Sequence, residues 1–66
     1  MTVTEALNEK LREHGWKQSQ MARELKLSQS FLHRLLSGER KAGHIGIRKI
    51  AARFPDLTPL LVGQEQ

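Results

Sequence analysis

The residue types best suited to chemistry lie together near the middle of the chain. They are polar side chains at helical spacing, namely Gln29, Ser30, His33 and Arg34. Amide, hydroxyl, imidazole and guanidinium groups are of the kinds that reach base edges in the major groove of DNA. No acidic residue lies between Leu25 and Gly38, so no carboxylate there would repel phosphate groups. The stretch is therefore typical of a surface that reads a polyanion through hydrogen bonds.

A helix over residues 28–37 would present these side chains on one face. Ser28 is a favourable N-cap, and Gly38 is a favourable stop after Ser37. At about 100° per residue, every polar side chain falls in one arc and every apolar one in the other. The apolar residues are Phe31, Leu32, Leu35 and Leu36. An ordinary amphipathic surface helix has the same period, but the polar arc here lacks the Glu/Lys pairs of a solvated face. Phe31 lies at the boundary, where it either packs in the core or touches a thymine methyl group.

A second short helix is predicted immediately before this one, at residues 18–25. The residues on its apolar face are Met21, Ala22 and Leu25. Only Lys26 and Leu27 separate the two helices, and so short a turn sets helices at a steep angle, as in a helix-turn-helix. Ala22 is small enough to let the second helix cross the first, and Leu27 fills the turn. The motif is expected at about residues 18–37.

The first helix is expected to follow Thr2, which forms a capping box with Glu5, and to end at His14 and Gly15. Its apolar face repeats every fourth residue, at Val3, Leu7 and Leu11. Trp16 then follows, and it either packs between helices or stacks on a base.

Two closing helices are expected at about residues 46–63. A basic connection, Glu39–Gly46, leads to the first of them, and Pro55 prevents its continuation. The apolar face of this helix contains Ile47, Ile50, Ala51 and Phe54. The last turn is expected to end before Gly63 and to start with a cap and a helix-opening proline, Thr58 and Pro59.

Length and composition indicate the fold class. The 66 residues suffice for one domain, residues 1–66, and 38% of them are hydrophobic, enough for one small core. We expect an all-α fold, a compact bundle of five short helices. Without cysteine the chain forms no disulfide and no thiolate zinc site, which indicates a reducing, cytoplasmic setting. No apolar run is long enough to span a bilayer. Secreted miniproteins, membrane proteins and zinc fingers are therefore excluded.

The charge of the chain is concentrated in its middle. The net charge is +4, but residues 16–53 alone carry nine lysines and arginines against two glutamates. The flanking segments are weakly acidic. A basic block within a small domain is the electrostatic pattern of a nucleic-acid binder, although many small proteins have a solvated basic face.

Four segments carry a pattern beyond periodicity. They are WKQSQMAREL at 16–25, LSQSFLHRLLSG at 27–38, IAARF at 50–54 and LLVG at 60–63. In this order and spacing they resemble the Cro and phage-repressor family, the XRE-type helix-turn-helix domains, over about residues 4–63. The resemblance implies a lambda repressor-like bundle of five helices that binds DNA as a dimer and regulates transcription. Two positions depart from the family pattern: Lys26 stands where glycine is frequent, and Leu36 where glutamate is frequent.

The resemblance also implies roles for particular residues. Gln18 matches the glutamine that opens the first helix of the motif and holds a phosphate beside the free amides there. Gln29 and Ser30 match the first base-reading positions, and Gln29 suits adenine. Arg34 suits guanine or, failing that, a phosphate. His33 either lies at the groove edge or faces solvent.

Further basic residues are candidates for contact with the DNA backbone. Together with Gln18, the phosphate contacts are expected to be Lys17, Arg40 and Lys41, with Arg23 nearby. Arg48 and Lys49 either belong to the same surface or are solvated.

A dimer follows from size and from the resemblance. One recognition helix reads only a few base pairs, too few to compete with the nonspecific sites of a genome. Two copies on a pseudo-palindromic operator multiply the discrimination. The candidate dimer residues are the apolar side chains near the end of the chain, which otherwise close the core: Leu57, Leu60, Leu61 and Val62.

The expected function is that of a bacterial or phage-encoded, nucleoid-associated repressor with a double-stranded operator. A chain this short leaves no room for an effector domain, which favours control by concentration in a phage switch, mobile element or autoregulated operon. No cofactor, metal, membrane or small-molecule ligand is expected. An enzyme is disfavoured, because the three histidines show no metal-binding or catalytic spacing. The alternative is a protein-interaction module, such as an antitoxin or polymerase-binding factor, that uses the final helix.

Overall fold

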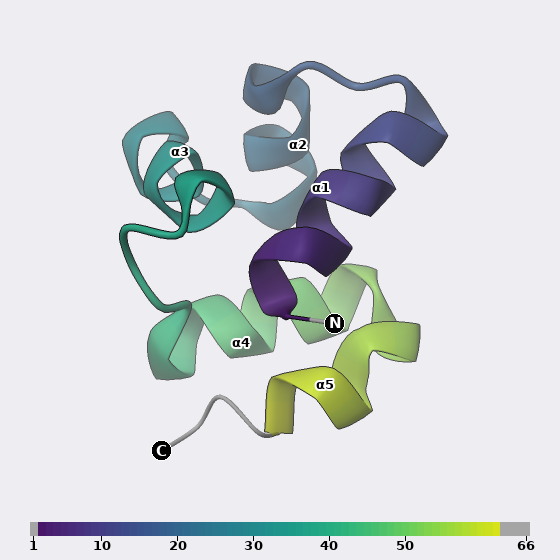
Figure 1. Ribbon diagram of the computed structural model, residues 1–66, viewed down its shortest axis with the longest axis vertical. Helices are drawn as coiled ribbons and strands as arrows, with labels where there is room; N and C mark the ends of the chain where they lie inside the picture. Colours follow the sequence, from purple (N-terminus) through teal and green to yellow (C-terminus); the bar gives the residue numbers. More distant parts are fainter. Residues whose placement is uncertain (1, 63–66) are drawn as a thin grey trace.

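The computed structural model describes residues 2–62 and is all-helical (Figure 1). The elements are α1 Val3–His14, α2 Gln18–Leu25, α3 Gln29–Ser37, α4 Gly43–Arg53 and α5 Thr58–Val62, with a 3-10 turn, η1 Pro55–Leu57, before α5. The described residues contain five α-helices and no strand, so the expected all-α bundle of five short helices is confirmed. The expected end of the last helix at Gly63 lies outside the described residues.

The helix ends follow local side-chain chemistry. Thr2 caps α1: its hydroxyl accepts from the Glu5 amide at 3.1 Å, and its own amide donates to the Glu5 carboxylate at 2.8 Å. Ser28 caps α3 by accepting from the Phe31 amide at 3.1 Å. These bonds satisfy amides that the first turn of a helix leaves without partners. The predicted capping box and the predicted start of α3 are confirmed.

The closing part of the chain differs from the sequence prediction in two ways. Helix α4 begins at Gly43, so the expected connection Glu39–Gly46 is wrong in its second half. Gly46 is buried within α4, where a Cβ would lie 3.3 Å from the Ala42 Cβ and 3.4 Å from the Phe31 ring. Thr58 has helical dihedrals and follows the η1 turn, so it is not the expected N-cap of the last helix.

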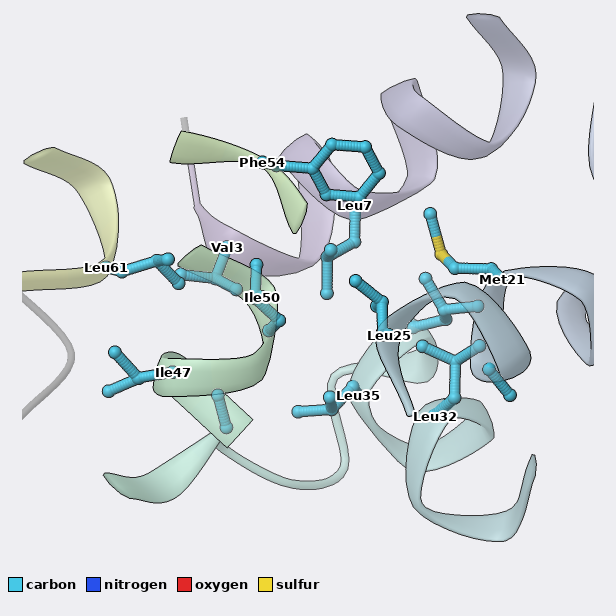
Figure 2. Packing of buried hydrophobic residues seen from close by; sticks show 13 residues of the cluster. Val3, Leu7, Met21, Leu25, Leu32, Leu35, Ile47, Ile50, Phe54 and Leu61 are labelled. Carbon is cyan, nitrogen blue, oxygen red and sulfur yellow. The ribbon is translucent and has the colours of Figure 1, made fainter. Parts of the chain in front are cut away.

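The core draws on all five helices. Its fully buried large side chains are Leu7, Met21, Leu25, Leu32, Leu35, Ile50 and Leu61. Figure 2 shows these side chains converging from different helices on one interior. Within residues 2–62 no buried side-chain nitrogen or oxygen lacks a hydrogen-bond partner. A core of this kind fixes the angular position of each helix, because turning a helix would expose its apolar face to water.

Helix α3 is fastened to α1 as well as to α2. Its last carbonyl groups have no partner within the helix. Thr4 donates its hydroxyl to the Leu35 carbonyl at 2.9 Å, and Asn8 donates its amide to the Leu36 carbonyl at 3.2 Å. Sequence reasoning missed these two bonds. They hold the C-terminal end of α3 and leave its outer face uncovered.

The connection between α2 and α3 is three residues long and depends on one unusual backbone conformation. Lys26 has φ 58° and is the only non-glycine residue with positive φ among residues 2–62. Lys26, at the position where the resemblance makes glycine frequent, thus adopts the left-handed conformation that glycine favours. The Lys49 ammonium donates to the Lys26 carbonyl at 2.8 Å, which ties the turn to α4.

Glycine at position 26 is expected to stabilise the protein. Lys26→Gly removes the Cβ that disfavours the left-handed region, and after the entropy cost of glycine the net gain is about 0.5–1 kcal/mol. Lys26→Ala is the matched control because it also loses the ammonium but keeps the Cβ. Thermal unfolding followed by circular dichroism should place Lys26→Gly above Lys26→Ala by several degrees, roughly 4 °C. Equal midpoints for the two variants would contradict the strain.

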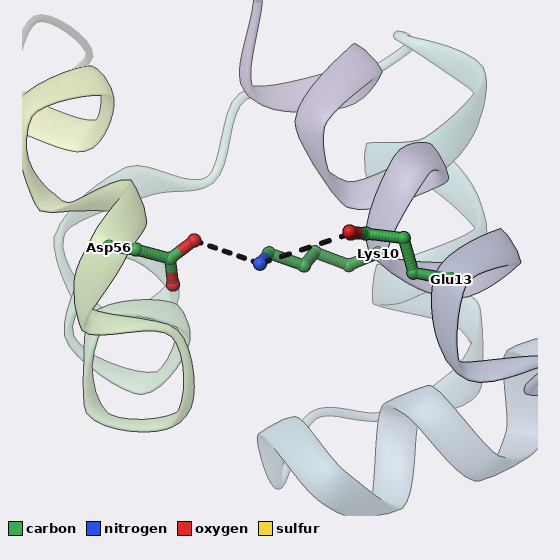
Figure 3. A network of polar contacts seen from close by, with 3 residues as sticks. All are labelled: Lys10, Glu13 and Asp56. Carbon is green, nitrogen blue, oxygen red and sulfur yellow. Dashed lines mark ion pairs between the residues drawn. The ribbon is translucent and has the colours of Figure 1, made fainter.

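A polar contact joins α1 to the η1 turn. The Lys10 ammonium lies 2.8 Å from the Asp56 carboxylate and 3.9 Å from that of Glu13, and Figure 3 shows it between the two. The hydrogen bond from Lys10 lowers the pKa of Asp56 from its ordinary value, and the same bond raises the pKa of Lys10. The Asp56 side chain is exposed and that of Lys10 is half-buried, so salt screens the contact in part.

These pKa shifts predict the pH range in which the contact stabilises the fold. Because the pKa of Asp56 is lowered on folding, its contribution is present above the ordinary aspartate pKa and is lost as the pH falls through the lowered value. The Lys10 contribution is present below the ordinary lysine pKa and is lost as the pH rises through the raised value. Asp56→Asn should therefore unfold at a lower temperature than the unmodified chain at neutral pH. The difference should disappear at about pH 2, below the ordinary aspartate pKa of about 3.9. A difference that persisted in acid would contradict the ion pair.

Candidate nucleic-acid interface

Helix α3 has one buried face and one exposed face. Leu32, Leu35 and Leu36 are 0%, 2% and 8% exposed, whereas the four candidate base-reading residues all lie on the solvent side. The predicted separation of apolar and polar arcs is thus confirmed. Leu36, which departs from the family pattern, packs in the core. In Figure 1, α3 lies at an outer edge of the molecule, on the far side from α5.

The candidate base-reading residues share one open depression with the start of α2. It is lined by Gln18, Gln29, Ser30, His33 and Arg34. The His33 ring nitrogen Nδ1 lies 3.4 Å from the Gln18 carboxamide oxygen, a contact between α3 and α2. The depression contains hydrogen-bond donors and acceptors and one fixed positive charge, but no carboxylate. The sequence placed four of these residues on one face of α3 and Gln18 at the start of α2, and the structure brings the two groups together.

The start of α2 leaves backbone donors free. Lys17 occupies the N-cap and makes no side-chain capping bond, and no acidic residue lies in the first turn. The first amides of a helix have no partner inside it, and the positive end of the helix dipole lies there. Lys17 and Gln18 are both exposed. This end of α2 therefore offers uncapped amides, an ammonium group and a carboxamide to an anion.

Arg40 and Lys41 are exposed but lie away from this depression. They line a second hollow, between the α3–α4 loop and the first turn of α1. The Arg40 amide donates to the Arg34 carbonyl at 3.3 Å, and its guanidinium lies 4.9 Å from the centre of the Phe31 ring. The predicted phosphate contacts thus form two groups, one at the start of α2 and one beyond the end of α3.

Two aromatic side chains, Phe31 and Trp16, are partly buried against the core. For both, the sequence left open core packing or contact with a DNA base. Phe31 packs on Gly46 beneath Arg40. The Trp16 ring stacks on that of His14 at 4.2 Å between centroids, and the Arg53 guanidinium lies 5.4 Å from its centre. These contacts favour the packing alternative for both rings.

Other basic residues differ in their surroundings. Arg48 is exposed on α4, whereas Lys49 is half-buried and bonded to the Lys26 carbonyl. Arg23, considered near the phosphates, is exposed on α2 and lies outside the depression. Lys49 therefore has a structural partner already, while Arg23 and Arg48 remain on the surface.

The candidate dimer residues separate into core and surface. Leu61 is 1% exposed and enclosed by the core of its own chain, which favours the alternative that it closes the core. Leu57 and Leu60 are half-buried against that core, and Val62 is 58% exposed. What remains for a partner is a smaller apolar strip on η1 and α5.

Sequence reasoning missed a groove at the start of α4. Its walls include Leu27, Phe31 and Ile45, with Arg40 and Lys49 beside them. Ile45 is 66% exposed, more than any other large hydrophobic residue in the described range. At helical spacing Ile45 falls on a different face from Ile47 and Ile50, and this was the sequence signal that it would be exposed. The expected connection Glu39–Gly46 hid that signal by treating Ile45 as loop.

No group of three or more metal-ligating side chains forms among residues 2–62. No described helix combines the length and the apolar character that a membrane crossing needs. Comparisons of this chain with protein-family models, with curated proteins and with solved structures gave no match.

Proposed function

We propose that this chain is a sequence-specific regulator that binds double-stranded DNA through the exposed face of α3. The observation that carries the proposal is the depression of Gln18, Gln29, Ser30, His33 and Arg34, which is exposed and free of carboxylates. A helix fits the major groove of B-DNA, and these side-chain types bond to base edges. Helix α3 is held from behind by apolar residues and by two bonds from α1, so its outer face is available to a duplex.

In this proposal α2 and α3 form a helix-turn-helix of the Cro and phage-repressor type. The three-residue connection with left-handed Lys26, and 2%-exposed Ala22 on the inner face of α2, support that assignment. In such motifs the second helix enters the groove and the first crosses the backbone. This arrangement would place the uncapped start of α2 against a phosphate, with Gln18 and Lys17 beside it.

Each base-reading residue has a chemical role in the proposed complex. The Gln29 carboxamide is suited to a bidentate bond with N6 and N7 of adenine. The Arg34 guanidinium is suited to O6 and N7 of guanine, one helical turn further along α3. Ser30 lies between them on the exposed surface and either donates or accepts. Arg40 and Lys41 would follow the backbone beyond the end of α3.

The proposed DNA-bound form is a dimer on a pseudo-palindromic operator, and its regulatory effect is repression. Two recognition helices must lie about 34 Å apart to meet successive major grooves on one side of DNA. The chain extends 28 Å in its longest dimension, so two copies fit side by side at that spacing. Val62, with half-buried Leu57 and Leu60, supplies the apolar strip between copies. Such a regulator would act in the cytoplasm, at the nucleoid.

Selection of bound duplexes from a random pool tests the proposal. The expected product is one half-site repeated in inverted orientation, with centres about 10 base pairs apart or a multiple of this spacing. Recovery of no preferred sequence, together with a nearly flat dependence of affinity on salt, would contradict a DNA-binding role. The absence of a preferred sequence together with a flat salt dependence would favour a protein-interaction module that uses the exposed strip of α5.

Lys41→Ala is expected to weaken binding to all duplexes alike. Lys41 is exposed and lies outside the depression, so its loss removes a phosphate contact without changing base recognition. The slope of log K against log salt concentration should become shallower by about 0.9, the value for one phosphate contact. Fluorescence anisotropy with the selected duplex and a scrambled one measures both slopes. A loss confined to the selected duplex would show that Lys41 reads bases instead.

A further inference from the structure

His33 differs from the other residues of the depression because its ring joins two helices and because an imidazole can gain a proton and become a donor at both nitrogens. Its Nδ1 atom lies 3.4 Å from the Gln18 carboxamide oxygen. A carboxamide oxygen only accepts hydrogen bonds, so this contact is a hydrogen bond in the tautomer that has its hydrogen on Nδ1. The contact orients the imidazole of α3 and the carboxamide of α2 together.

The hydrogen-bonding role of the second ring nitrogen, Nε2, then follows from the role of Nδ1. In a neutral imidazole with hydrogen on Nδ1, Nε2 is an acceptor. The phosphate oxygens of a duplex are acceptors as well, and so are O6 and N7 of guanine. Neutral His33 therefore has no hydrogen to offer such an atom from Nε2. A proton on Nε2 makes the ring a donor at both nitrogens and adds a positive charge.

No carboxylate lines the depression, so none there stabilises a positive charge on His33. Helix α2 contributes neutral Gln18 to the depression, and α3 contributes neutral Gln29 and Ser30 together with the positive Arg34. No residue of α1, which packs on α3, or of α4 lines it. Lys17, adjacent to Gln18 in the chain, adds a further positive charge on the exposed surface. A negative partner for protonated His33 would therefore have to come from the bound duplex.

We propose that His33 takes up a proton when the chain binds DNA, donating from Nε2 to an acceptor of the duplex while Nδ1 stays bonded to Gln18. This inference rests on the proposed function and adds a regulatory property to it. An anion beside a titratable group favours its positive form. Because the complex then holds more protons than the free protein, affinity for DNA rises as the pH falls. The duplex atom is an acceptor, either a phosphate oxygen or a base-edge atom.

The pH dependence of duplex affinity tests this, with the other two histidines as matched controls. Fluorescence anisotropy with the selected duplex at constant ionic strength should show roughly tenfold tighter binding at about pH 5.5 than at about pH 8. His33→Gln keeps a hydrogen-bonding side chain but has no titrating group, and its affinity should change little over this range. His14→Gln and His44→Gln should keep the pH dependence of the unmodified chain. Calorimetry in buffers of different ionisation enthalpy should also show proton uptake that His33→Gln abolishes.

The possible failures are distinguishable. If the unmodified chain binds duplexes but His33→Gln retains the same pH dependence and proton uptake, the inference is overturned while the proposed function stands. If the unmodified chain binds no duplex at any pH, both are overturned. A scrambled duplex separates the two kinds of acceptor. Equal pH dependence on both duplexes assigns the bond to a phosphate, and dependence on the selected duplex alone assigns it to a base edge.

Discussion

Leu32→Ala is expected to leave much of the protein unfolded under conditions where the unmodified chain is folded. Leu32 is fully buried at 0% exposure, on the inner face of α3. Truncating a buried leucine to alanine costs about 2–5 kcal/mol, because apolar contacts are lost and a cavity remains. A core in a domain of this size provides roughly 3–5 kcal/mol in total. The two magnitudes are alike, so one substitution removes most of the margin.

Urea unfolding followed by circular dichroism measures this loss. Ile45→Ala is the matched control, because isoleucine has the size of leucine but this side chain is 66% exposed. The control should change the free energy of unfolding by less than about 0.5 kcal/mol, as exposed positions usually do. Equal losses in the two variants would mean that Leu32 is not the core residue of this fold.

Arg34→Ala is expected to have the largest effect on DNA binding among the exposed substitutions. A bidentate contact between arginine and guanine contributes about 1–3 kcal/mol, which is roughly a five- to 150-fold change in affinity. Arg34 lies in the exposed depression, and its backbone carbonyl accepts hydrogen bonds from the Ser37 hydroxyl and from the amides of Glu39 and Arg40. The loss should fall on the selected duplex, and discrimination at one base pair should relax.

A control variant that removes one arginine from another part of the surface separates recognition of bases from nonspecific electrostatic attraction to DNA. Arg12→Ala removes the same charge from an exposed position on α1, outside the depression. It should weaken binding slightly and to the same extent for every duplex. Circular dichroism should show both variants folded. If Arg34→Ala and Arg12→Ala lost the same affinity on both duplexes, Arg34 would contribute only charge.

Much of the fold was predictable because local signals were strong. Thr2 with Glu5, Ser28 and Gly38 determine helix ends through hydrogen bonds to neighbouring residues, and such bonds depend on a few adjacent positions. The face of α3 follows from the period of its apolar residues. The helix-turn-helix geometry and the family resemblance stay predictions.

The features that the sequence did not predict depend on contacts between distant segments. The sequence placed Gly46 at the junction of the connection and the helix, whereas α4 begins at Gly43 and Gly46 packs against Ala42 and Phe31. Leu61 and its exposed neighbour Val62 are both apolar residues near the end of the chain. Only the packing of α5 on the core distinguishes them. The bond between His33 and Gln18 joins residues fifteen positions apart. Periodicity placed His33 on the polar arc and gave no partner for it.

The central claim is that a duplex contacts the outer face of α3. Titrating isotope-labelled protein with the selected duplex and following backbone and side-chain amide signals by nuclear magnetic resonance tests it directly. The largest shifts are expected on Gln18 and on residues 29–34, with the Gln18 and Gln29 side-chain amides among them. Shifts that gathered on α5 while these amides stayed unchanged would contradict it.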